Sequence, residues 1–139
     1  MPKADRISPG GVKLLQEPQL AHVVTLMTDG SPQVTPVWVD VEPDGSHILI
    51  NTAEGRVKAN NVERDNRVAI SVVDKDNPWR YVLVRGRIAE RRHEGADAHI
   101  DALAKKYLGK DEYPFRRPGE QRVTLRIKPR HVIERGIKN

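Results

Sequence analysis

Hydrophobic and polar residues alternate in several segments of this chain, a pattern typical of β-strands that bury one face. Six segments show the alternation or a short run rich in β-branched residues: 21–27, 33–41, 46–51, 68–73, 79–90 and 122–134. Asp29-Gly30 and Pro43-Asp44-Gly45 are turn sequences that separate the first three segments. We therefore predict that residues 1–50 contain a meander of three antiparallel strands.

Two residues modify these strands. Pro36 interrupts the segment 33–41 and has no N–H to donate, so we expect it at a sheet edge or a bulge. Gly86 lies within the segment 79–90, where a glycine indicates a bulge or a close approach of another backbone. The alternation in that segment places Val82 and Val84 on the same face as Gly86.

The period changes to that of a helix in three places, at 11–17, 56–64 and 94–108. The last is the strongest, because Ala96, Ile100, Leu103 and Tyr107 form one apolar stripe and Gly109 supplies a C-terminal cap. The strands cluster and the helices are few. The pattern thus predicts a mainly β fold with peripheral helices, a small barrel of six antiparallel strands in one domain over residues 1–139.

The composition narrows the possible functions. There are 24 Lys and Arg against 19 Asp and Glu, a formal charge of +5 that favours anionic partners. The charge is dispersed and no cluster of stacking aromatics accompanies it, which disfavours a nucleic-acid-binding barrel. No cysteine is present, so disulfides, Cys-ligated zinc, iron–sulfur clusters and a Cys nucleophile are excluded.

Other signals are missing from the sequence. No apolar run approaches the roughly 20 residues of a membrane helix, and the N-terminus has no apolar signal core, so we expect a cytoplasmic protein without membrane contact. The five histidines show no metal-binding spacing, and we expect no metal. The chain has neither a P-loop nor a G-x-G-x-x-G motif, and no residue can be assigned a catalytic role.

The most informative stretch is 50–67, where an apolar strand turns through Gly55 into a short helix. Arg56 and Lys58 lie at the start of that helix. Exposed N–H groups and the helix dipole favour phosphate there, and the two cations add charge-assisted hydrogen bonds. The alternative interpretation is that Arg56 and Lys58 are ordinary surface cations.

Three further features have open interpretations. Asn61 in the same helix is suited to bonding a phosphate or a ribityl hydroxyl, or it belongs to a polar helix face. Residues 33–36 offer backbone groups to a planar heterocycle, or they form an ordinary edge strand. Trp79 covers a ring, or it fills the core or a subunit interface.

An ordered set of motifs over residues 8–135 resembles the pyridoxamine-phosphate-oxidase-like family of split β-barrel flavin and deazaflavin proteins. The matching features are Thr25-Leu26, Asp29-Gly30-Ser31-Pro32, Val34-Thr35-Pro36-Val37-Trp38, Asn51-Thr52, Gly55-Arg56-x-Lys58, Asn61, Arg64-Asp65-Asn66-Arg67-Val68-Ala69 and Tyr81-Val82-x-Val84-x-Gly86-x-Ile88. The short chain and the G-R-x-K turn look most like the branch that uses coenzyme F420, a deazaflavin.

This resemblance implies a six-stranded antiparallel split β-barrel of the FMN-binding type, and a homodimer with cofactor sites across the subunit interface. It implies that Arg56 and Lys58, with Val57 between them, hold the cofactor phosphate, and that Asn61 adds a hydrogen bond. The residues implied along the ring and the ribityl chain are Gln33, Val34, Thr35, Pro36, Ile50, Asn51 and Thr52. Those implied from the partner subunit are Trp79, Arg80 and Tyr81, with Arg87 nearby.

The implied function is that of an F420-dependent oxidoreductase. Reduced deazaflavin would transfer a hydride to an electron-poor small molecule, such as an enone or a conjugated tetrapyrrole, which explains why the chain shows no obvious acid, base or nucleophile. One alternative is an FMN-dependent oxidase or reductase on the same fold. Another is a non-catalytic carrier or sensor that binds a flavin, a deazaflavin or a haem-like ligand.

Overall fold

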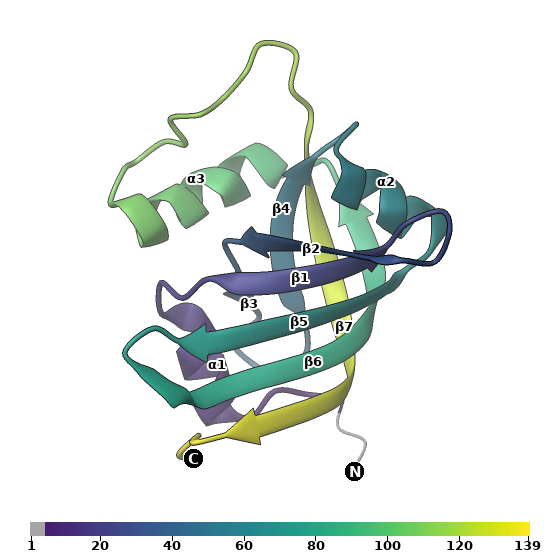
Figure 1. Ribbon diagram of the computed structural model, residues 1–139. Helices are drawn as coiled ribbons and strands as arrows, with labels where there is room; N and C mark the ends of the chain where they lie inside the picture. Colours follow the sequence, from purple (N-terminus) through teal and green to yellow (C-terminus); the bar gives the residue numbers. More distant parts are fainter. Residues whose placement is uncertain (1–4) are drawn as a thin grey trace.

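The computed structural model describes residues 5–139 and consists of one curled antiparallel sheet with three helices (Figure 1). The sheet has seven strands in the order β2-β1-β5-β6-β7-β4-β3. The strands are β1 (Ala21–Leu26), β2 (Pro32–Val37), β3 (Asp40–Val41), β4 (Ile48–Ala53), β5 (Arg67–Asp74), β6 (Asn77–Arg92) and β7 (Arg122–Arg135). The prediction of a mainly β, antiparallel fold is confirmed.

The three helices lie at the two ends of the curled sheet, α1 (Pro9–Gln16) at one end and α2 (Val57–Arg64) and α3 (Ala96–Leu108) at the other (Figure 1). α1 begins at Ser8, whose hydroxyl accepts a hydrogen bond from the N–H of Gly11. α3 ends at Gly109, where φ is 70°, as the sequence predicts. All three predicted helices are present, and their ends differ from the predicted ends by at most two residues.

The core fills the concave face of the sheet. Ile48 and Ile50 of β4 and Leu125 and Ile127 of β7 are completely buried there. Each such side chain stabilises the fold by about 1.5–3 kcal/mol relative to an exposed one. The alternation predicted for β6 is confirmed, because Val82 and Val84 are buried and the side chains between and beyond them point outward.

The number of strands and the predicted meander were wrong. Residues 33–41 do not form one strand: β2 pairs with β1 at one edge of the sheet, and β3 pairs with β4 at the other. The chain changes edges at Trp38-Val39, where the N–H of Val39 donates to the Tyr107 hydroxyl of α3 (3.0 Å) instead of to a strand. Turn sequences fix only local reversals, so they could not indicate that β4 would pair with the distant β7.

Both strand-modifying residues behave as predicted. Pro36 lies in β2, an edge strand. The β6–β7 register shifts between Arg85 and Gly86, and a Cβ atom on Gly86 would lie 2.3 Å from the carbonyl oxygen of Lys128. In the part of the chain from residue 5 onward, no helix is long and apolar enough to cross a membrane.

Candidate functional site

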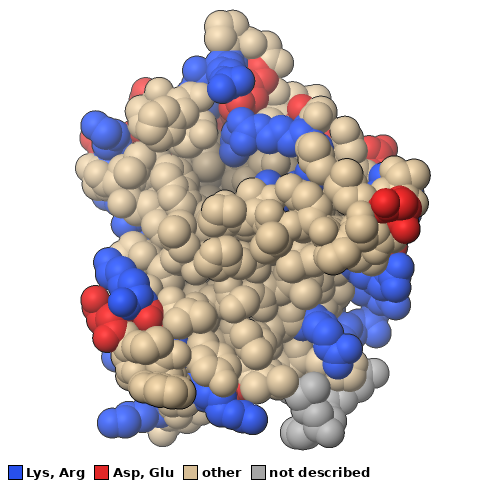
Figure 2. All heavy atoms as spheres, in the orientation of Figure 1, with Lys and Arg blue, Asp and Glu red and all other residues tan. Residues whose placement is uncertain are grey.

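A hollow of about 350 Å³ lies where α3, the start of α2, and β2 approach one another. We call it the helix-end hollow, and it opens in the upper part of the face in Figure 2, near basic side chains. Its lining comes from seven separate stretches of the chain: Leu20, Thr35, Pro36, Val37, Trp38, Asn51, Arg56, Lys58, Ile100, Leu103, Tyr113, Phe115 and Arg122.

One end of the helix-end hollow is cationic. Arg56 is the N-cap residue of α2, and the turn before it requires Gly55 at a φ of 86°. Arg122, only 5% exposed, donates from Nε to Oδ1 of Asn51 (2.8 Å). Both guanidinium groups also reach the carboxylate of Glu120, at 3.3 Å from Arg56 and 3.0 Å from Arg122. A single carboxylate therefore serves two arginines.

Lys58 makes this end electrostatically unbalanced. It is only 8% exposed, and within residues 5–139 its ammonium group forms no hydrogen bond or ion pair. Burial, followed by the charges of Arg56 and Arg122, lowers the pKa of Lys58. A buried cation beside two others is costly unless an anion joins it. Two arginines share one carboxylate at a helix N-terminus and Lys58 beside them has none, so the site is suited to a phosphate or carboxylate ligand.

The other end of the helix-end hollow is aromatic. Trp38 stacks on Tyr107 with a centroid distance of 5.2 Å and meets Tyr113 edge-on at 6.0 Å. Tyr113 also contacts Phe115 edge-on and lies 5.2 Å from the guanidinium carbon of Arg122. Aromatic walls of this kind suit a planar ring, and the Tyr113 contact joins them to the cationic end.

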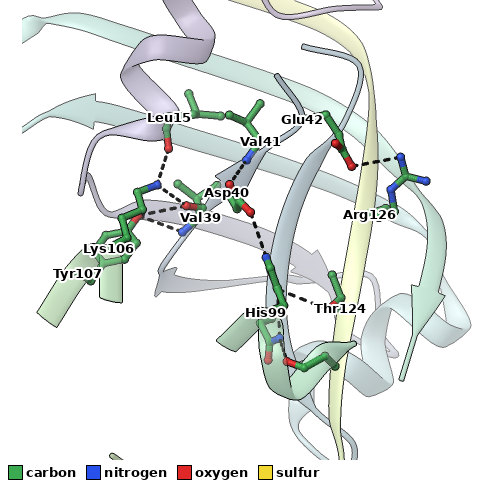
Figure 3. A network of polar contacts seen from close by, with 12 residues as sticks. Leu15, Val39, Asp40, Val41, Glu42, His99, Lys106, Tyr107, Thr124 and Arg126 are labelled. Carbon is green, nitrogen blue, oxygen red and sulfur yellow. Dashed lines mark hydrogen bonds and ion pairs between the residues drawn. The ribbon is translucent and has the colours of Figure 1, made fainter. Parts of the chain in front are cut away.

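Polar contacts hold α3 as a wall of the hollow (Figure 3). The ammonium group of Lys106 donates to the carbonyl oxygens of Leu15 (2.6 Å) and Val39 (2.7 Å). The Tyr107 hydroxyl donates to the carbonyl oxygen of Gln19, and His99 lies 3.3 Å from the carboxylate of Asp40. These contacts fix α3 against the segments that precede β1 and β3.

We expect Lys106 to make stability depend on alkaline pH. Burial lowers its pKa from 10.5 to about 8, against a smaller opposite effect of Asp40. Between these two pH values the unfolded chain binds more protons than the native one, so the free energy of unfolding rises with pH there. Below about pH 8 the cost of burying the charged Lys106 is fully present and does not change with pH. Urea unfolding at about pH 7 and about pH 9.5 should show this rise relative to Lys106→Met. Equal changes in both proteins would contradict it.

The structure brings together part of the residue set that the resemblance implies. Thr35, Pro36, Asn51, Arg56 and Lys58 line the helix-end hollow. They come from β2, β4 and α2, which is the arrangement expected for a site with a ring end and a phosphate end.

Several others on β2, β4 and α2 lie beside the hollow without lining it. Ile50 is completely buried in the core, and the hydroxyl of Thr52 is buried. Gln33 donates its amide to the Thr35 hydroxyl (3.0 Å), while Val34 lines a different hollow. Val57 is exposed to solvent.

Asn61 is occupied within the fold. Its amide donates to the Thr25 hydroxyl (3.0 Å), and its oxygen accepts from Arg64 (3.0 Å). The side chain is 3% exposed. In this conformation Asn61 joins α2 to β1 and leaves no free donor directed at the hollow.

The remaining four residues lie on β6, away from the helix-end hollow of their own chain. Trp79 is 79% exposed. Arg80 is paired with Glu17 and Asp74, each at 2.9 Å. Tyr81 lies opposite Arg135 of β7, and Arg87 lines another hollow.

Sequence reasoning missed the aromatic residues and the third cation of the site. Tyr113 and Phe115 belong to the segment 110–121, to which the sequence analysis assigned neither a helix nor a strand, and Arg122 opens the strand that follows it. A signal was present, because the chain has only 2 Trp, 3 Tyr and 1 Phe and two of these six fall in one loop. Only the three-dimensional structure, however, shows that this loop folds back over Trp38.

The fold and the site together define a curled-barrel protein with a cationic and aromatic hollow at a helix start. A family model described as Pyridoxamine 5'-phosphate oxidase matches residues 11–136, and the chain belongs to this family. The family resemblance predicted from the sequence is therefore confirmed.

Similar proteins give a more specific comparison. The F420H(2)-dependent biliverdin reductase of Mycobacterium tuberculosis (strain CDC 1551 / Oshkosh) is 29% identical over 129 residues, covering 92% of this chain and 88% of the relative. A solved structure named F420 Reductase has a TM-score of 0.78 and 29% identity, covering 91% of this chain and 98% of its own. HupZ of Group A Streptococcus shares the fold, with a TM-score of 0.66, 21% identity, and coverage of 96% and 98%.

Proposed function

We propose that this protein is an F420-dependent oxidoreductase that binds the cofactor in the helix-end hollow. The observation that carries the proposal is the group of Arg56, Lys58 and Arg122. The two arginines share the carboxylate of Glu120, and the buried Lys58 pairs with no acidic side chain among the described residues. The two relatives that are 29% identical over more than 90% of this chain carry F420 in their names. Bound F420 would supply hydride chemistry, and the electron-poor substrate would be of the enone or conjugated tetrapyrrole type.

The residues of the chain would bind and orient the cofactor. Arg56 and Lys58 would hold the phosphate, with Arg122 donating beside them. Thr35 and Pro36 of the edge strand would flank the ring on one side, and the Trp38 and Tyr113 rings would exclude water on the other. No side chain is assigned a proton-transfer role.

The proposal includes a homodimer in which Trp79 reaches the cofactor of the partner subunit. The support is its position, because Trp79 is a large apolar residue that is 79% exposed near the start of β6. Arg80 is held beside it by Glu17 and Asp74, so this end of the strand is tied to α1 and β5. Exposed large aromatic residues on an ordered segment are typical of interfaces.

Side-by-side titrations of the apo-protein with F420 and with FMN test the function, with intrinsic tryptophan fluorescence as the measurement. We expect tight F420 binding that quenches Trp38, which lines the hollow, and much weaker FMN binding. The opposite order of affinities would indicate the FMN-dependent alternative. Absence of binding by both would refute the proposed site, and binding without turnover of a panel of acceptors would indicate a carrier or sensor.

The same titration on Trp79→Phe tests the dimer separately. If Trp79 of one subunit lies on the cofactor of the other, the variant loses a large part of the quenching and binds F420 less tightly. Unchanged quenching and affinity would remove Trp79 from the site and leave the F420 assignment intact.

A further inference from the structure

A continuous chain of polar contacts runs behind the cationic end of the helix-end hollow. It joins four side chains from four elements: Asp40 of β3, His99 of α3, Asn51 of β4 and Arg122 of β7. Figure 3 shows the His99 ring reaching from α3 toward both Asp40 and Thr124. Of these residues only Asn51 and Arg122 line the hollow, so the others can affect a ligand there only indirectly.

The amide group of Asn51 has only one satisfactory orientation. Its nitrogen donates to the carbonyl oxygen of Ala96 (2.9 Å) and lies 3.2 Å from Nδ1 of His99. Its oxygen accepts from Nε of Arg122 (2.8 Å). In the reversed orientation two oxygens would face each other at Ala96, and two N–H donors would face each other at Arg122. Because such contacts leave polar groups unsatisfied, the acceptors on α3 keep the Asn51 oxygen turned toward Arg122.

The same contacts determine which nitrogen of His99 carries the proton. Asn51 offers an N–H to Nδ1, and the Thr124 hydroxyl lies 3.4 Å from it, so Nδ1 is the acceptor. The proton is then on Nε2, which donates to the carboxylate of Asp40 (3.3 Å). Burial acts to raise the pKa of Asp40, but hydrogen bonds from His99 and from the N–H of Val41 lower it overall. Asp40 is therefore a carboxylate that holds His99 in this tautomer.

Arg122 is held at three points. Its Nε donates to Asn51, its Nη1 donates to Glu120 (3.0 Å), and its guanidinium carbon lies 5.2 Å from the centre of the Tyr113 ring. Within residues 5–139 its Nη2 forms no hydrogen bond, and the side chain lines the hollow. A guanidinium group fixed in this way presents its remaining donors to an oxyanion in one direction.

We propose, on the basis of the F420 site described above, that His99 is a positioning residue that acts through Asn51 to direct Arg122 toward the cofactor phosphate. His99 does not line the hollow, so it would not touch the cofactor itself. Its Nδ1 keeps the Asn51 oxygen in place, and without that oxygen Arg122 would rotate toward Glu120 alone. The important feature of His99 is therefore its acceptor atom. A His99 that only fastens α3 to β3 would need no such acceptor.

Two variants separate positioning from packing. His99→Asn retains an amide oxygen close to the place of Nδ1, whereas His99→Leu has no acceptor. Leu is the better helix former, so a purely structural role would favour His99→Leu over His99→Asn. We expect the opposite order for F420 binding, measured by tryptophan quenching. His99→Leu should bind about tenfold more weakly than the native protein, and His99→Asn less than about threefold more weakly.

The deazariboflavin core of F420, which ends at the ribityl hydroxyl and carries no phosphate, is the matched ligand. Both variants should bind it as the native protein does, because Arg122 is directed at the phosphate. His47→Leu is the control, since it makes the same change between β3 and β4 at a residue that does not line the hollow. Equal loss of the two ligands in His99→Leu, or equal loss of F420 in His99→Leu and His99→Asn, would overturn the positioning role.

A measurement without cofactor keeps this proposal separate from the proposed function. The Nε–H group of Arg122 should give a distinct signal in a proton–nitrogen NMR spectrum, which Arg122→Lys identifies by its loss. We expect the signal to shift or disappear in His99→Leu and to remain in His99→Asn and His47→Leu. An unchanged signal in His99→Leu would overturn the link from His99 to Arg122, whether or not F420 binds. Failure of the native protein to bind F420 would instead refute the proposed function and the phosphate as the target of Arg122.

Discussion

Replacing Lys58 with Met is expected to raise the free energy of unfolding and, at the same time, to weaken F420 binding. Lys58 is buried beside Arg56 and Arg122 without a partner of its own among the described residues. An apolar side chain of similar length removes that repulsion and that desolvation, which we expect to stabilise the apo-protein by about 1 kcal/mol. The same change removes a charge-assisted contact to the phosphate, worth about 1.5–3 kcal/mol, so affinity should fall roughly ten- to hundredfold.

Urea unfolding and F420 titration measure the two effects independently. The double variant Arg56→Ala/Lys58→Ala should lose about 3–6 kcal/mol of binding free energy, with little change in folding. Lys105→Met is a matched control, because Lys105 is exposed on α3 and the same chemical change there should alter neither quantity. Unaltered affinity in the double variant would disprove the phosphate assignment, and a destabilised Lys58→Met would show that the ammonium group has a stabilising role in the fold.

The sequence could indicate the cationic end of the site because the residues that form most of it are neighbours in the chain. A helix start with Gly55, Arg56 and Lys58 within four residues is a local pattern, and local chemistry suffices to suggest an anion there. Arg122 could not be found in this way. It reaches Asn51, which lies 71 residues earlier in the chain, only because β7 pairs with β4.

The same distinction separates the correct parts of the predicted fold from the incorrect ones. Periodicity located the helices and most of the strands, because each side chain's face depends on its immediate neighbours. The partner of β4 depends on the whole sheet, and the three-strand meander failed for that reason. The end of β2 just before Trp38 could not be predicted from the sequence for the same reason. Trp38 stacks on Tyr107 of α3, which lies far from it along the chain.

Gly86→Ala is expected to destabilise the protein by about 3 kcal/mol, because the added methyl group meets backbone atoms. The new Cβ would lie 2.3 Å from the carbonyl oxygen of Lys128, 3.1 Å from its carbonyl carbon and 3.3 Å from Cα of Pro129. None of these atoms can rotate away as a side chain could. Relief requires β7 to move away from β6 at the register shift between Arg85 and Gly86, which weakens pairing along the two longest strands.

Urea unfolding of Gly86→Ala should therefore show a midpoint far below that of the native protein, with a similar dependence on urea concentration. Gly30→Ala provides the control. Gly30 has a φ of 84° in the turn between β1 and β2, but an added Cβ would meet nothing within 4 Å, so only backbone strain of about 1 kcal/mol is expected. If the two substitutions cost the same, the close approach of β7 would not be what requires glycine at position 86.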